Sequence, residues 1–141
     1  AGKISGITDV ELLERHGKEV EEKSFATEEE MLQKIAEQSS EALNRKDGKF
    51  ETAAVITMTE EGAFDIYRLL RNRRVDASYV DRNSSVFKKG LTVTTFYLAK
   101  GLEFDQVFSI RGEKKNPLAK QAAYICATRA LHELYVYEVE A

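Results

Sequence analysis

The chain has 141 residues, of which 43% are hydrophobic and 32% charged, and its formal net charge is −3 at pH 7. This length and composition predict one soluble globular domain with a single core. No apolar run approaches the roughly 20 residues that a bilayer-spanning helix needs, and no signal peptide opens the chain, so we expect a cytoplasmic protein without a membrane partner.

From residue 28 onward, helical and strand patterns alternate. Thr27 and Glu30 form a capping box, and the apolar residues behind it recur at helical spacing. The segment TAAVITM, residues 52–58, is a short apolar run typical of a strand buried on both faces of a parallel sheet. The predicted elements are, in chain order, a helix over 28–45, a strand over 52–58, a helix over 59–70, a strand near 77–80, strands over 91–96 and 106–110, a helix over 118–130 and a strand over 134–139.

This alternation predicts a three-layer α/β domain with a largely parallel sheet, because strands separated by single helices pair in parallel beneath those helices. Residues 1–22 carry no pattern that assigns an element. The single cysteine, Cys126, cannot form an internal disulfide, and its place in a predicted helix indicates a small buried thiol. No metal site is predicted, because His16 and His132 are far apart and no Cys/His cluster exists.

Charge is distributed unevenly. Acidic residues concentrate in 19–22 and 28–30, whereas basic residues gather in 68–74, at 88–89 and in 111–115. The arginines of 68–74 form either a solvated helix end that opposes the helix dipole or a nucleic-acid or partner surface. The negative net charge argues against a protein that binds nucleic acid through an overall positive surface, although a local positive groove is sufficient to hold one nucleic-acid strand.

The most informative stretch is TVTTFYLAKGLEFDQVF, residues 92–108. Its β-branched start indicates a strand, and Gly101 allows a close approach that a Cβ would block. Lys100 and Glu103 lie on the same turn, where charged side chains face solvent or a ligand. Near the C-terminus, small residues in AAYICATRA favour a helix packed closely on the sheet, with Arg129 near its end. A turn with a lysine and a glutamate, followed by a helix that carries an arginine, suits binding a nucleotide from one side.

These two blocks resemble motifs V and VI of the UvrD-like (superfamily 1A) helicases. The family forms are roughly T-x-H-x-A-K-G-L-E-F and L-Y-V-A-x-T-R-A, and this chain reads TFYLAKGLEF over 95–104 and AYICATRA over 123–130. The resemblance implies that residues 1–141 are the second RecA-like domain of a helicase motor, called 2A, with motif V at 92–108 and motif VI at 121–132. The sequences of both blocks are most similar to those of the HelD branch, whose members bind RNA polymerase.

The resemblance implies an ATP half-site. Arg129 matches the motif VI arginine that reaches the γ-phosphate, and Glu103 matches the glutamate that accepts a hydrogen bond from the nucleotide sugar. Gly101 would let the backbone come close, and Lys100 matches a motif V lysine at the same interface. The alternatives are an arginine that caps a helix, a surface carboxylate and a solvated lysine.

The sequence lacks a GxxxxGK[ST] phosphate loop (Walker A) and a plausible Walker B partner. The expected fold is therefore a RecA-like, P-loop NTPase-type domain without its own Walker A loop. ATP and Mg²⁺ would bind mainly to an upstream RecA-like domain of the same protein. The 141-residue chain alone is predicted to be inactive as an ATPase.

Nucleic-acid contacts are implied for Thr95, which matches a threonine that donates to a backbone phosphate, and for Tyr97, which stands where many members have a histidine. An aromatic ring there can stack on a base. Two departures weaken the inference of duplex unwinding: Thr57-Met58-Thr59 stands where DNA-unwinding members often read Y-R-T, and Ala119-Lys120-Gln121 replaces the acidic and arginine residues that often precede motif VI.

Three functions remain open. The first is the motor domain of a UvrD-like translocase that moves on single-stranded DNA, with 3′ to 5′ polarity as in that family. The second is the motor domain of a HelD-type ATPase that releases RNA polymerase from nucleic acid, which Tyr97 and Met58 favour modestly. The third is a degenerate domain kept as a scaffold. The loop over 111–117 is short for this family, so either this member is trimmed or residues between the two motifs are absent from the chain.

Overall fold

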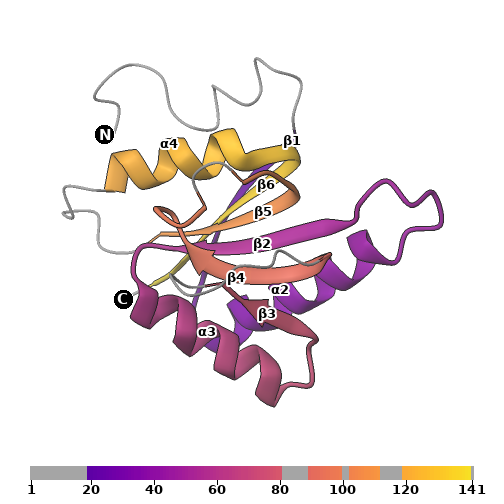
Figure 1. Cartoon of the computed structure of the whole chain (residues 1–141). Coiled ribbons are helices and arrows are strands. Elements are labelled where there is room, and N and C mark those ends of the chain that lie inside the picture. The colour runs from indigo at the N-terminus through magenta and orange to yellow at the C-terminus, as the bar shows by residue number, and fades with distance from the viewer. Residues whose placement is uncertain (1–18, 81–88, 100–101, 112–118, 141) are drawn as a thin grey trace.

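The computed structural model describes residues 19–80, 89–99, 102–111 and 119–140 (Figure 1). The elements are β1 (Glu19–Phe25), α2 (Glu28–Leu43), β2 (Thr52–Thr57), α3 (Glu60–Asn72), β3 (Ala77–Tyr79), β4 (Gly90–Thr95), β5 (Phe104–Ile110), α4 (Ala119–Arg129) and β6 (Ala130–Val139). No helix among the described residues is long and apolar enough to cross a membrane.

The strands form one parallel sheet in the order β1-β6-β5-β2-β4-β3. Figure 1 shows α4 on one face of this sheet and α2 with α3 on the other. The predicted three-layer α/β fold with a parallel sheet is therefore confirmed. Since all strands run the same way, the sheet has one edge where strands begin and one where they end, here called the amino edge and the carboxyl edge.

Each face of the sheet carries its own core cluster. Along β2, Ala54 and Ile56 point to the α4 side, whereas Ala53 and Val55 point to the α2 and α3 side. All four side chains are at most 1% exposed. This two-sided burial explains why β2 reads as a continuous apolar run rather than an alternating one.

Threonine caps fix where α2 and α3 begin. The Thr27 hydroxyl accepts from the Glu30 backbone N–H at 3.2 Å, as the capping box predicted. The Thr59 hydroxyl accepts from the Gly62 N–H at 3.0 Å, and a Cβ on Gly62 would lie 3.1 Å from that same hydroxyl. Glycine at 62 therefore leaves room for the cap that starts α3 at the carboxyl edge.

The structure departs from the sequence-based elements at both ends of the described chain. Strand β1 begins within residues 1–22, to which no element was assigned, and ends at Phe25; it was missed because its sequence EVEEKSF is mostly charged. It pairs with β6 through its backbone, from Glu19↔Glu133 to Phe25↔Val139, so the strand needs few apolar side chains. The predicted strand over 134–139 was too short, because β6 begins at Ala130 directly after α4.

Candidate functional site

Glu103 and Arg129 lie next to neighbouring strand starts on the amino edge of the sheet. Phe104, the first residue of β5, is the register partner of Ala130, the first residue of β6. Glu103 and Arg129 immediately precede these two residues, so their backbones leave neighbouring strands, which lie roughly 4.8 Å apart. Glu103 is exposed. Lys100 and Gly101, predicted for the same site, lie outside the described residues.

Arg129 is the last residue of α4 and is only partly exposed. Its Nη2 donates to the Thr128 hydroxyl at 3.2 Å, and that hydroxyl in turn donates to the Ile125 carbonyl at 3.0 Å. The Arg129 Nε is buried and has no hydrogen-bond partner among the described residues. A guanidinium donor left unpaired in this way costs roughly 1–3 kcal/mol.

A β-bulge lies at the start of β5 and β6, just after Glu103 and Arg129. Phe104 pairs with Ala130 and Gln106 with Glu133, so Leu131 and His132 together oppose the single residue Asp105. Bulges turn the strand locally and are frequent beside active sites. This bulge sets the direction in which the chain leaves Arg129 to enter the sheet.

Asp105 ties the start of β5 to the start of β2. Its Oδ2 accepts hydrogen bonds from the backbone N–H groups of Glu51 at 2.8 Å and Thr52 at 3.1 Å, and from the Thr52 hydroxyl at 3.3 Å. The Asp105 N–H donates back to the Thr52 hydroxyl at 3.0 Å. The Oδ1 lies 3.6 Å from Nε2 of His132. We call this group of contacts the Asp105 lock.

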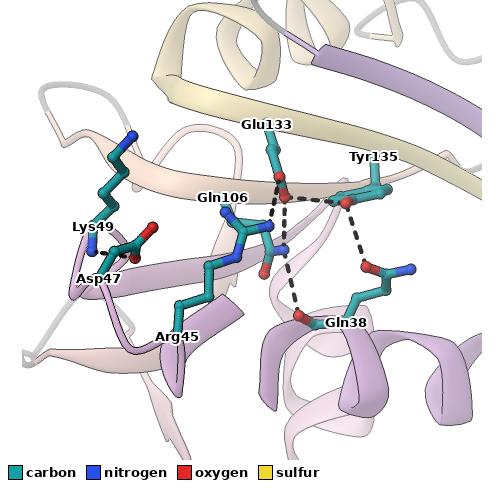
Figure 2. A network of polar contacts seen from close by, with 7 residues as sticks. All are labelled: Gln38, Arg45, Asp47, Lys49, Gln106, Glu133 and Tyr135. Carbon is teal, nitrogen blue, oxygen red and sulfur yellow. Dashed lines mark hydrogen bonds and ion pairs between the residues drawn. The ribbon is translucent and has the colours of Figure 1, made fainter. Parts of the chain in front are cut away.

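A second polar cluster lies beneath the same edge, on the α2 side (Figure 2). Glu133 is its centre: Oε1 accepts from Gln106 Nε2 and lies equally close, at 3.0 Å, to the Tyr135 hydroxyl, while Oε2 pairs with Arg45 Nη2 at 3.4 Å. Gln38 of α2 joins the cluster, because its side-chain oxygen lies 3.3 Å from the Tyr135 hydroxyl. Burial, reinforced by the Glu133 charge, raises the pKa of Tyr135. The cluster places a carboxylate under the start of β6, held by three donors.

Sequence reasoning missed both Asp105 and Glu133. Asp105 lies inside the motif V block, where the functional role was assigned to Glu103, two residues earlier. Glu133 alternates with apolar residues on β6, which is the pattern of a solvent-facing carboxylate, yet its side chain is 8% exposed. A buried carboxylate of this kind can be found only when its distant donors, Arg45 after α2 and Gln106 on β5, are known.

Thr95 and Tyr97 lie at the opposite, carboxyl edge. Thr95 ends β4, is the register partner of Thr57, and is 1% exposed, and its hydroxyl has no hydrogen-bond partner among the described residues. Tyr97 is half-buried against the α4-side core, with its ring edge-to-face on Phe96 at 5.4 Å. The structure thus separates the expected nucleic-acid residues from Glu103 and Arg129 by the length of the strands.

The arginines of α3 are partly neutralised by neighbouring carboxylates. Arg68 lies 3.5 Å from Asp65, and Arg71 lies 3.4 Å from Asp76. Of the two alternatives left by the sequence, these pairs favour a solvated helix end over a nucleic-acid groove.

The two hollows given by the described residues lie away from the described site residues. A shallow open hollow of about 460 Å³ lies between β1, α2 and Arg73, and its lining mixes lysines, glutamates and Arg73. None of Glu103, Arg129, Thr95 or Tyr97 lines it. Within the described ranges, no group of three or more His, Cys, Asp or Glu could hold a metal ion. A site completed by a second domain needs no closed pocket in one of its halves.

Comparison with solved structures places this fold among C-terminal helicase domains. The C-terminal domain of a possible DNA helicase from Lactobacillus plantarum WCFS1 matches with a TM-score of 0.68 and 22% identity, over 86% of this chain and 73% of that one. The C-terminal domain of the DEAD-box protein Dbp5 matches at 0.60 and 14% identity, over 88% and 77%. An arterivirus nonstructural protein 10 helicase, solved with DNA, matches at 0.55 and 15%, over 86% of this chain and 28% of that chain.

No protein-family model matches the sequence, and no curated protein does. At these identities the structural likeness shows the fold, which is that of RecA-like helicase C-terminal domains. The roles of individual residues must be argued from their geometry.

Proposed function

We propose that this chain is the C-terminal motor domain, 2A, of an ATP-dependent DNA helicase or translocase of the UvrD-like kind. The observation that carries the proposal is the position of Glu103 and Arg129, which immediately precede the register partners Phe104 and Ala130 at adjacent strand starts on the amino edge. The fold thereby brings near one another two residues that lie 26 positions apart in the sequence, as an ATP half-site requires. In this proposal all of residues 1–141 belong to one domain.

Each residue has a distinct role. Arg129 reaches the γ-phosphate and stabilises the charge that develops as the phosphoryl group is transferred. Glu103 accepts a hydrogen bond from the nucleotide sugar, and Lys100 with Gly101 completes the same side. Mg²⁺ and most of the phosphate contacts come from an upstream RecA-like domain of the full protein. The position of the partly exposed Arg129 directly before β6, with its Nη2 held by the Thr128 hydroxyl, supports this assignment.

The nucleic-acid track lies at the carboxyl edge. Thr95 donates to a backbone phosphate and Tyr97 contacts a base, so that single-stranded DNA lies along the carboxyl ends of the strands. The motor moves along this DNA in the 3′ to 5′ direction. The position of Thr95 at the end of β4 supports its role. Opening and closing of the cleft between the two RecA-like domains supplies the stroke.

The test is made in a protein that contains both RecA-like domains. Arg129→Ala should lower kcat by roughly 10³-fold or more, while KM for ATP changes much less, because the contact is made mainly in the transition state. Arg129→Lys should restore activity only in part, since an ammonium lacks the planar fork of donors. Arg68→Ala, which removes an exposed arginine from α3, is the matched control and should leave kcat unchanged.

Thermal melts accompany the kinetics. A kcat of Arg129→Ala within a few-fold of the unaltered protein, measured on a folded variant, removes Arg129 from the catalytic set. Loss of activity that follows loss of the fold removes it as well.

A second candidate is a HelD-type ATPase that displaces RNA polymerase. It is favoured by the half-burial of Tyr97, whose ring already packs on Phe96 and has less surface left for a base. Met58 stands where a cationic strand contact would be expected. Direct binding of the full protein to single-stranded DNA and to RNA polymerase, measured side by side, separates the two candidates.

A further inference from the structure

Glu103 is an exposed residue between anchored neighbours. Phe104 follows it and is fully buried in the core on the α4 side, where partly buried Leu102 also packs. Asp105 then holds the chain through its carboxylate, which is 14% exposed. What holds Phe104 and Asp105 therefore restrains the backbone that carries Glu103, and with it the direction of the Glu103 Cα–Cβ bond.

The Asp105 lock holds the start of β5 against the start of β2. One oxygen accepts from the backbone N–H groups of Glu51, which precedes β2, and of Thr52, which begins it. The Thr52 hydroxyl donates to the same oxygen and accepts from the Asp105 backbone N–H. Hydrogen bonds to an ionised carboxylate are shorter and stronger than those between neutral groups. The lock also spans the bulge, since Oδ1 faces His132 on β6. Three strand starts are thus held at one carboxylate.

We propose that Asp105 is a positioning residue for Glu103 in the nucleotide half-site. This inference rests on the proposed function, and it adds a residue that touches no ligand. By fixing the backbone of β5 against β2, Asp105 holds the Glu103 carboxylate where the nucleotide sugar arrives. Without the lock, Glu103 samples several orientations, and the nucleotide must select one of them on binding.

The test is a double-mutant cycle on nucleotide affinity in the protein with both RecA-like domains, with a non-hydrolysable Mg–ATP analogue as the probe. Asp105→Ala should weaken binding about 5–20-fold, and Glu103→Ala should weaken it by a similar factor. The double variant should bind no more weakly than Glu103→Ala alone, because Asp105 acts through a side chain that is already missing. In ATPase assays, Asp105→Ala should raise KM and leave kcat within about threefold.

Two further variants keep the test valid if Asp105→Ala folds poorly. Asp105→Asn retains an oxygen that can accept the Glu51 and Thr52 bonds, so its affinity should stay within about twofold. Thr52→Val removes the hydroxyl but keeps a strand-forming side chain, and its loss of affinity should also disappear in the Glu103→Ala background. Thr27→Ala, which removes the α2 cap at the other edge, controls for general destabilisation and should leave affinity unchanged.

The outcomes are distinct. Coupled losses support the positioning role. Additive losses, or a loss from Thr27→Ala equal to that from Asp105→Ala, overturn it, because the effect then comes from general stability. If Glu103→Ala leaves nucleotide affinity unchanged, the proposed sugar contact itself fails, and the role of Asp105 fails with it.

Discussion

The ion pair of the buried Glu133 carboxylate with the exposed Arg45 offers a stability prediction that is independent of any function. Its N···O distance is 3.4 Å, and the two side chains are 8% and 39% exposed. At an effective dielectric constant of about 20, two unit charges at this distance attract with about 5 kcal/mol, which is an upper bound. Because water reaches Arg45, we reduce this figure to about 2 kcal/mol. The Arg45 guanidinium also lies 4.6 Å from the Phe50 ring centroid, and such a contact adds about 0.5–1 kcal/mol.

Arg45→Ala should therefore lower the free energy of unfolding by about 2–3 kcal/mol, because Glu133 keeps only the neutral donors Gln106 and Tyr135. In the Glu133→Gln background there is no buried charge to leave unpaired. The same arginine substitution should then cost only about 0.5–1 kcal/mol, the value of the ring contact.

Urea unfolding of the isolated chain, followed by circular dichroism, measures all four proteins of this cycle. The m-values should agree, so that differences in midpoint report stability. Lys89→Ala is the matched surface control, because the Lys89–Glu51 pair is 79% and 58% exposed and should contribute under about 1 kcal/mol. Equal costs of Arg45→Ala in both backgrounds would refute the assignment of this charge pair.

Two further predictions concern tyrosines. In the full protein, Tyr97→Ala should weaken binding to single-stranded DNA by roughly 1–3 kcal/mol if its ring stacks on a base, with ATP affinity nearly unchanged. Tyr97→Phe keeps the ring and should bind normally. Unaltered binding by the alanine variant would make Tyr97 a packing residue. Burial raises the pKa of both Tyr135 and Tyr137 above 10.0, so the fold favours their neutral forms. Their stabilising contribution should be complete below about pH 10 and should decline as the pH rises further. Unfolding midpoints between pH 8 and about 11 should fall less steeply in Tyr135→Phe, and an identical slope would contradict the shift.

The fold could be predicted from the sequence wherever local pattern and final environment agree. Strand β2 is apolar because both of its faces are buried, and α3 begins at the threonine whose hydroxyl caps it. Strand β1 could not be predicted, because it is an edge strand held by backbone pairing with β6, to which side chains contribute little. Its charged residues are typical of an edge that avoids pairing with other chains.

The candidate site divides in the same way. Glu103 and Arg129 were found because their neighbours in sequence resemble two motifs, and the structure then brings them to adjacent strand starts. The contacts of Asp105 depend on Thr52, which lies 53 residues away, and those of Glu133 depend on Arg45 and Gln106. No local pattern encodes such pairings. They follow from the order of the strands, which places β5 between β2 and β6.

The segment that connects β4 to β5 links the expected nucleic-acid residues, Thr95 and Tyr97, to Glu103 of the expected ATP half-site along the chain. It leaves the carboxyl edge after Thr95 and must return to the amino edge at Phe104, because both strands run parallel to β2. Phe96 and Ala99 are buried in the same core cluster as Phe104, so the described part of this segment is packed on the sheet. The residues next to Thr95 and Glu103, namely Phe96 and Phe104, therefore belong to one core cluster between the sheet and α4.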